Sequence, residues 1–101
     1  MDNILGGISK FHSKLLTNIE YDDFDDMIPS TIGLYLFIGD VNDMQHKPET
    51  FTGWTCGLVF NVNGTRFVHF MIDAHTLTTK IRRRDGNTLE WSSWSEIQFV
   101  S

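Results

Sequence analysis

Two tryptophans and three basic residues in the last quarter of the sequence are the side chains best suited to contact a ligand. Trp91 and Trp94 are separated by two serines, and Lys80, Arg82 and Arg84 alternate with other residues. Because successive side chains of a strand point to opposite faces, the three basic residues would share one face. Aromatic rings stack on sugars, and guanidinium groups bind carboxylates and phosphates. The combination predicts a glycan contact, particularly with an anionic glycan such as teichoic acid or an acidic polysaccharide.

Each of these features also has a structural explanation. Trp91 and Trp94 are three residues apart, so a regular pleat would place them on opposite faces unless a bulge turns Trp94 inward. Trp94 is therefore either a core residue or an exposed aromatic platform. The basic stretch can be a solvated strand edge that prevents aggregation, or it can form ion pairs with the acidic residues 22–26 of a neighbouring subunit.

The remaining reactive side chains do not form a recognisable catalytic or metal motif. Four aspartates between residues 22 and 26 lack the order of a calcium loop and are interpreted as a helix cap and a solvated face. The four histidines have no zinc spacing, and His69 is expected to be a structural residue. Cys56, in the middle of an apolar strand, is expected to be a small core residue. We therefore expect no metal, no cofactor and no enzymatic activity.

The composition describes one acidic domain. The chain has 101 residues, 41% of them hydrophobic and 21% charged, with a net charge of -5. Residues 1–50 contain nine acidic and three basic side chains, a net charge of -6, and residues 51–101 contain four and five, a net charge of +1. This charge balance disfavours nucleic-acid binding. Binding through the basic strand is a minor alternative. No apolar run approaches 18 residues and no basic n-region opens the chain, so we expect neither membrane insertion nor a signal peptide.

Residues 1–19 carry an apolar stripe at helical spacing. The stripe predicts a helix from Ser9 to Asn18. It would anchor the chain, either by associating with copies of itself about a three-fold axis or by inserting into a groove of another protein. The alternative is a helix that packs on its own sheet. The residues of the stripe are Ile4, Ile8, Phe11, Leu15 and Leu16.

Residues 20–101 are predicted to form a β-rich domain. One or two helical turns between Asp22 and Ile28 precede strands at 32–38, 54–62, 65–73, 77–84 and 90–100, with a loop at 41–53 and a tight type I′ turn at Asn63-Gly64. In the second strand, Trp54, Cys56, Leu58 and Phe60 share one apolar face. The strand at 65–73 is apolar on both faces, which predicts burial on two sides, by the short helices or by a neighbouring subunit. The expected fold class is a mainly β, small antiparallel meander or sandwich with short N-terminal helices.

Several short motifs occur in a recognisable order. They are an Asp-rich turn before Gly33-Leu34-Tyr35, then Gly57-Leu58-Val59, then Ile81-Arg82 with Asp85-Gly86, and finally Trp91-Ser92-Ser93-Trp94-Ser95-Glu96-Ile97. In this order the region from about Asn18 to Phe99 resembles the knob domain of R-type pyocin and tailed-bacteriophage fibres. The resemblance implies a small β-rich knob, usually trimeric, that adheres to bacterial surface glycans. The family has a single arginine, matched by Arg82, where this chain has three, and it has a fibre shaft before the knob.

The resemblance leads to a functional expectation. The chain would be a non-enzymatic, homotrimeric fibre or knob component of a bacteriophage virion, assembled in the host cytoplasm. Its apolar stripe would attach it to a capsid, tail or fibre protein. Trp94, Arg82 and Arg84, with the loop from Asn42 to Phe51, would contact host glycans. The alternatives are a capsid-mounted head fibre or decoration protein without receptor affinity, and a small cellular carbohydrate-binding module.

Overall fold

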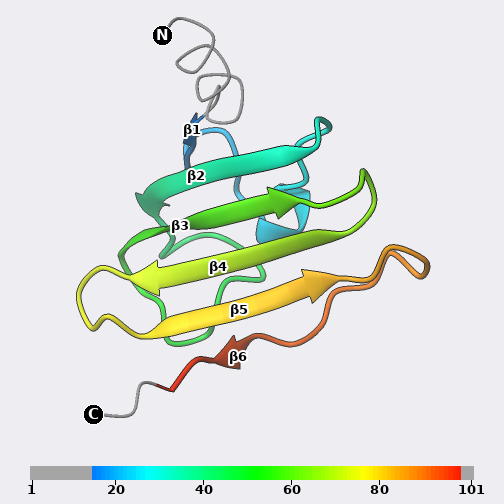
Figure 1. Ribbon diagram of the computed structural model, residues 1–101. Helices are drawn as coiled ribbons and strands as arrows, with labels where there is room; N and C mark the ends of the chain where they lie inside the picture. Colours follow the sequence, from blue (N-terminus) through cyan, green and yellow to red (C-terminus); the bar gives the residue numbers. More distant parts are fainter. Residues whose placement is uncertain (1–14, 99–101) are drawn as a thin grey trace, which may run out of the picture.

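The computed structural model of the protein describes residues 15–98. These residues are organised around one six-stranded sheet (Figure 1). The strands follow one another in the sheet in their sequence order. Neighbours from β2 to β6 are antiparallel, whereas β1 runs parallel to β2. The chain is therefore mainly β, as predicted, with a single mixed sheet over the described residues. The strands are β1 (Leu15–Leu16), β2 (Gly33–Asp40), β3 (Trp54–Asn61), β4 (Phe67–Asp73), β5 (Thr79–Arg84) and β6 (Ser95–Glu96).

The predicted helix from Ser9 to Asn18 is wrong in the part that the structure describes. Leu15 and Leu16 pair with β2, and a turn follows at residues 18–20 instead of a continuing helix. Leu16 is fully buried while Leu15 is 46% exposed. This is the two-residue alternation of a strand, and the pairing satisfies backbone groups of β2 that an edge strand would leave open. The rest of the stripe, Ile4, Ile8 and Phe11, lies outside the described residues.

The one or two helical turns predicted between Asp22 and Ile28 are reduced to a single 3-10 turn, η1 (Phe24–Asp26). Asp23 caps it, because its Oδ1 accepts a hydrogen bond of 2.9 Å from the backbone N–H of Asp25. The turn brings Phe24 fully into the core. It is too short to count as one of the predicted N-terminal helices.

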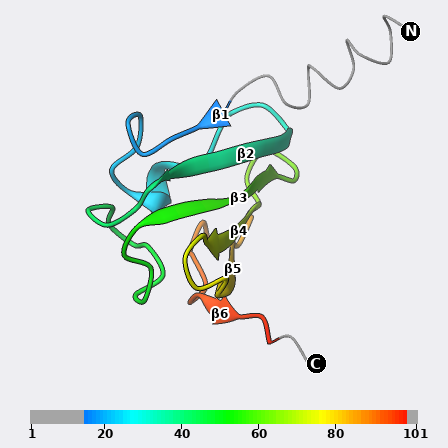
Figure 2. The same cartoon turned by 90° about the vertical axis from the view of Figure 1, so that its left-hand side faces the viewer.

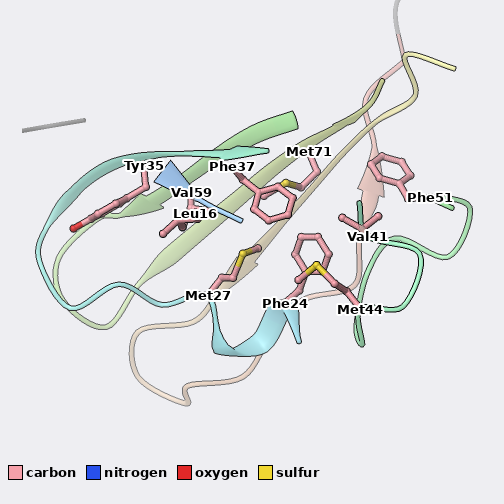
Figure 3. Packing of buried hydrophobic residues seen from close by; sticks show 10 residues of the cluster. All are labelled: Leu16, Phe24, Met27, Tyr35, Phe37, Val41, Met44, Phe51, Val59 and Met71. Carbon is pink, nitrogen blue, oxygen red and sulfur yellow. The ribbon is translucent and has the colours of Figure 1, made fainter. Parts of the chain in front are cut away.

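The core lies on one side of the sheet. In the side view of Figure 2, η1 and the loop at 41–53 cover the same side. The predicted loop at 41–53 is confirmed: it joins β2 to β3 and contributes three buried apolar residues. Figure 3 shows the cluster that fills the space between sheet and loops. Its members are Leu16, Phe24, Met27, Tyr35, Phe37, Val41, Met44, Phe51, Val59 and Met71.

The apolar face of β3 points away from this core. Thr55, Val59 and Asn61 are buried, whereas Trp54 and Cys56 are exposed. The prediction that Cys56 is a core residue is therefore wrong. The opposite face is selected because Phe37 of β2 and Met71 of β4 flank Gly57, and the missing side chain there leaves them room.

The turn between β3 and β4 differs from the predicted two-residue turn. Its closing hydrogen bond runs from the N–H of Val62 to the carbonyl of Arg66, so three residues form the loop. Gly64 has a φ of 98°, while Asn63 does not adopt the positive φ of a type I′ turn. The Asn63 side chain instead accepts hydrogen bonds from the N–H groups of Thr65 and Arg66, which stabilises the longer loop.

Candidate functional site

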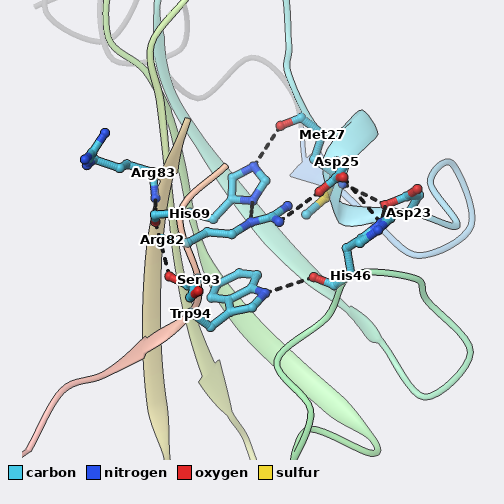
Figure 4. Close-up of polar contacts among 10 residues, drawn as sticks. Asp23, Asp25, Met27, His46, His69, Arg82, Arg83, Ser93 and Trp94 are labelled. Atoms are coloured by element: carbon cyan, nitrogen blue, oxygen red, sulfur yellow. Dashed lines mark hydrogen bonds and ion pairs between the residues drawn. The ribbon is translucent and has the colours of Figure 1, made fainter. Parts of the chain in front are cut away.

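A buried arginine on β5 is the centre of the polar interior (Figure 4). Arg82 is 5% exposed and points toward the same side of the sheet as the core. Its Nε donates to Nδ1 of His69 at 3.2 Å, and its Nη1 donates to Oδ1 of Asp25 at 2.8 Å. The guanidinium carbon lies 3.8 Å from the ring centroid of Trp91 and 4.7 Å from that of Trp94. We call these five residues the Arg82 cluster.

The hydrogen bonds of His69 fix its protonation. Because Nδ1 accepts from Arg82, Nε2 carries the proton and donates to the carbonyl of Met27 at 2.9 Å. Burial and the charge of Arg82 lower the pKa of His69 to about 3. Burial lowers the pKa of Arg82 as well, against the opposing hydrogen bond and charge of Asp25. The cluster thus combines a neutral imidazole with one ion pair.

A β-bulge turns both tryptophans toward this cluster. Arg84 pairs with Trp91 and Ile81 pairs with Ser95, so the last segment has one residue more than β5 over the same distance. Trp94 consequently packs against the core, with its ring edge-on to Phe24 at 5.6 Å between centroids. The interpretation of Trp94 as a residue turned inward by a bulge is confirmed. The predicted strand at 90–100 is reduced to β6 and the bridge at Trp91 over the described residues.

A surface network joins the loop at 41–53 to η1. Nδ1 of His46 lies 2.8 Å from Oδ1 of Asp23 and 3.4 Å from Oδ2 of Asp25. The hydrogen bond with Asp23 and the charges of both carboxylates raise the pKa of His46. Burial raises the pKa of Asp23, but hydrogen bonds from the Asp25 N–H and His46, with the charges of His46 and Arg82, lower it further than burial raises it.

This network is better suited to hold charges together than to bind a cation. Ligand atoms of Asp23, Asp25 and His46 lie within 4.8 Å of one another, which is close enough for a metal site. However, Asp25 is already bound by Arg82, and a protonated His46 repels a cation. The three groups therefore tie the loop to η1.

Two hollows lie beside Trp94, which belongs to both linings. The first has a volume of about 370 Å³ between the loop at 41–53 and β5. Its lining combines an indole ring, two hydroxyl groups, one ammonium group and one carboxylate, which are the groups that can stack on and hydrogen-bond to a sugar. The second, of about 350 Å³, includes Asp25, His46 and the edge of Arg82. The first hollow is lined by Pro48, Glu49, Thr50, Lys80, Ser93 and Trp94.

The structure brings together only part of the predicted glycan site. The loop from Asn42 to Phe51 does reach Trp94, whose Nε1 donates to the carbonyl of His46 at 2.9 Å. Arg82 is buried, so it supports the tryptophans instead of presenting its charge to solvent. Arg84 is the last residue of β5 and pairs with Trp91, and its guanidinium carbon lies 5.5 Å from the ring centroid of Phe67.

The structure also bears on two further predictions, one for the basic strand and one for the anchoring residues in β1. One of the alternatives for the basic strand was an ion pair with residues 22–26 of a neighbouring subunit, and the structure instead has such a pair within one chain, between Arg82 and Asp25. Of the anchoring residues that the structure describes, Leu15 is exposed on the sheet, whereas Leu16 is a core residue and is unavailable to a partner.

The sequence-based prediction of a contact site included the loop from Asn42 to Phe51 without singling out Glu49 and Thr50, and it missed Ser93 as a lining residue and His46 as a charged partner. Their residue types are common on any surface, and only the path of the loop over β5 brings them to Trp94. Comparisons with protein-family models, with curated proteins and with solved structures found no match to this chain. Within residues 15–98, the structure has no helix long and apolar enough to cross a membrane.

Proposed function

We propose that this chain is a non-enzymatic structural component of a bacteriophage particle, a knob or fibre domain that works as a homotrimer in the virion. The main support is that residues from two of the motifs shared with the knob domains contact each other in the structure. Arg82 of the Ile81-Arg82 motif is held between Trp91 and Trp94 of the terminal motif. A motif whose members hold one another in place is a feature of the fold, and this supports a relation to the knob domains.

Glycan adhesion would use the first hollow beside Trp94. Lys80 and Glu49 supply charge there, Thr50 and Ser93 supply hydroxyl groups, and the indole of Trp94 supplies an apolar wall. Lys80 forms an ion pair of 3.3 Å with Glu96, so its ammonium group is held at the rim. The volume of the hollow, about 370 Å³, is large enough for a single sugar of a surface polysaccharide.

A decoration or head-fibre protein without receptor affinity is the second candidate. This candidate is favoured because two of the predicted contact residues are not free to bind a glycan. Arg82 is buried, and Trp94 is partly buried against the core. In either case the residues before Leu16, with the exposed Leu15 among them, would attach the domain to a capsid, tail or fibre protein. A cellular carbohydrate-binding module is the alternative outside this class.

Polysaccharide binding separates the candidates. Purified chain would be passed over immobilised lipopolysaccharide or teichoic acid, together with Lys80→Ala and the control Arg66→Ala, whose side chain lies at the exposed β3–β4 turn. Adhesion through the hollow predicts binding that Lys80→Ala weakens about tenfold and Arg66→Ala leaves unchanged. A decoration protein would show no binding in any variant.

Location tests the proposal as a whole. Purified phage particles that contain this chain should show, in an electron cryo-microscopy map, a small three-fold symmetric knob that an antibody against the chain labels. A chain that is absent from purified particles and binds glycan as a monomer would overturn the proposal in favour of the cellular module.

A further inference from the structure

The face of the sheet opposite the core is bare over the described residues. Figure 1 looks onto this face, and in Figure 2 it is the right-hand side of the strands, away from η1 and the loop at 41–53. Register places apolar side chains next to one another across three strands, with Ile38 beside Cys56 and Ile72, and Leu36 beside Leu58 and Phe70. We call these six residues the open face.

We infer that the open face is the surface through which copies of this chain associate, with a sister copy as its occupant. The inference gives a surface to the self-association that the proposed function includes, but it depends only on the sheet. Leu36 is 42% exposed and Ile38 is 47% exposed. Trp54, at the end of β3 on the same face, is 62% exposed. Contiguous apolar side chains at this exposure are typical of protein interfaces.

The size of the face favours a sister copy over a single segment. Strands β2 to β5 have six to eight residues each. With strands about 4.8 Å apart and about 3.3 Å per residue, they span about 19 Å by 23 Å. The projected area is about 440 Å² per partner, which corresponds to the lower end of protein interfaces, where association is weak or transient.

A single helix covers less of this sheet than a second sheet does. Its diameter of about 10–12 Å corresponds to two or three of the four strands, so β5 with Ile81 and Arg83 would stay outside the contact. A second sheet packs over a whole face at a separation of about 10 Å, with interdigitating side chains. Another copy of this chain supplies such a sheet with the same apolar composition.

Charge is confined to the edges of the face. Asp40 lies at the end of β2, opposite Trp54, and Arg83 lies on β5, opposite Val68. They are at diagonal corners of the sheet and have opposite signs. A sister copy therefore meets an apolar centre with no like charges directly opposed there, which is the arrangement of a protein interface with a polar rim.

Sedimentation of the full chain over a wide concentration range tests the inference. We expect the wild type to associate and Leu36→Glu to raise the dissociation constant at least about 100-fold, because the interface would bury an unpaired carboxylate. The matched control is Leu89→Glu, which changes a leucine that is 50% exposed in the turn after β5 and should stay within about twofold of the wild type.

The outcomes are distinct. Circular dichroism would show whether Leu36→Glu stays folded, and Ile38→Glu is a second variant on the same face. A wild type that is monomeric at every concentration, or folded face variants that associate like the wild type, would overturn the inference. If the wild type is a dimer that both face variants disrupt, the inference is supported but the homotrimer of the proposed function is not. If it is a trimer that persists in both variants, the homotrimer is supported and the inference is overturned.

Discussion

Arg82 is a full charge inside a small domain, so its partners decide whether the domain is stable. Its ion pair with Asp25 offsets part of the cost of removing the charge from water, and the two indole rings add cation–π contacts. Within the described residues, Nη2 has no hydrogen-bond partner. A buried ion pair of this kind adds little net stability. Removing one of its members is nevertheless costly, because the other is left buried without a partner.

We expect Arg82→Met to lower the free energy of unfolding by about 3 kcal/mol, because it leaves Asp25 without its guanidinium partner and Nδ1 of His69 without a donor. Arg83→Met is the control on the same strand. The Arg83 side chain is 61% exposed, so its loss should cost less than about 0.5 kcal/mol. Urea denaturation measures both values, and equal losses would contradict a stabilising role for the Arg82 cluster.

Stability should fall when the pH decreases from about 6.5 toward 3. In this range His69 is neutral in the folded protein, because its pKa is lowered to about 3, whereas it is protonated in the unfolded chain. The unfolded state then binds more protons, so stability rises with pH by up to about 1.4 kcal/mol per pH unit. Urea denaturation at a series of pH values would measure this slope. A His69→Gln variant that keeps the full slope would exclude this cause.

His46 should act in the opposite direction. Its pKa is raised by Asp23 and Asp25, so its contribution is complete below its ordinary value of 6.5 and is lost as the pH rises through the raised value. An NMR titration should therefore give His46 a pKa above 6.5. Asp23→Asn should lower this pKa, while Asp43→Asn, elsewhere in the same loop region, should not. A value for His46 at or below 6.5 would contradict the network.

At the level of elements, Gly57 explains which side of the sheet became the core. A Cβ at this position would lie 2.6 Å from Sδ of Met71 and close to the carbonyl oxygen of Phe70. We expect Gly57→Ala to destabilise the domain by about 2 kcal/mol. Gly53→Ala is the control, since nothing lies within 4 Å of its Cβ, and it should change stability by less than about 0.5 kcal/mol. Thermal or urea unfolding would show the difference, and similar values for both variants would refute the close packing.

The sequence was sufficient to locate the long strands and the capped turn at Asp23. Alternation and turn residues report local geometry, and β2 to β5 depend mainly on that. The inward face of β3 could not be predicted, because both faces contain apolar side chains and the choice depends on Gly57 and on the loop that crosses the core. Leu15 and Leu16 fit a helical stripe equally well, and only pairing with β2 distinguishes the strand.

The candidate site shows the same limit. The inward turn of Trp94 was one of two alternatives, because a bulge depends on the pairing of β5 with β6 and not on the local sequence. The pair of Asp25 with Arg82 joins residues 57 positions apart. Opposite charges were visible in the sequence, but whether they meet within one chain or between chains is a property of the tertiary fold.

At the scale of the whole molecule, the two sides of one sheet have different roles. One side is closed by the loop at 41–53, η1 and the Arg82 cluster, and it carries the hollows beside Trp94. The other side is the open face, which has no covering layer within residues 15–98. A domain of this size buries only part of its apolar surface alone. Association through the open face would bury the rest and present the hollows outward.

The reactivity of Cys56 tests this division most directly. It is the single cysteine of the chain, and it is exposed at the centre of the open face. With a maleimide reagent, we expect labelling of the full wild-type chain to slow as protein concentration rises, and labelling of Leu36→Glu to stay fast throughout. A wild-type rate that is fast at every concentration, as for a free face, or a slow rate that Leu36→Glu shares, as for a face covered by its own chain, would contradict the association.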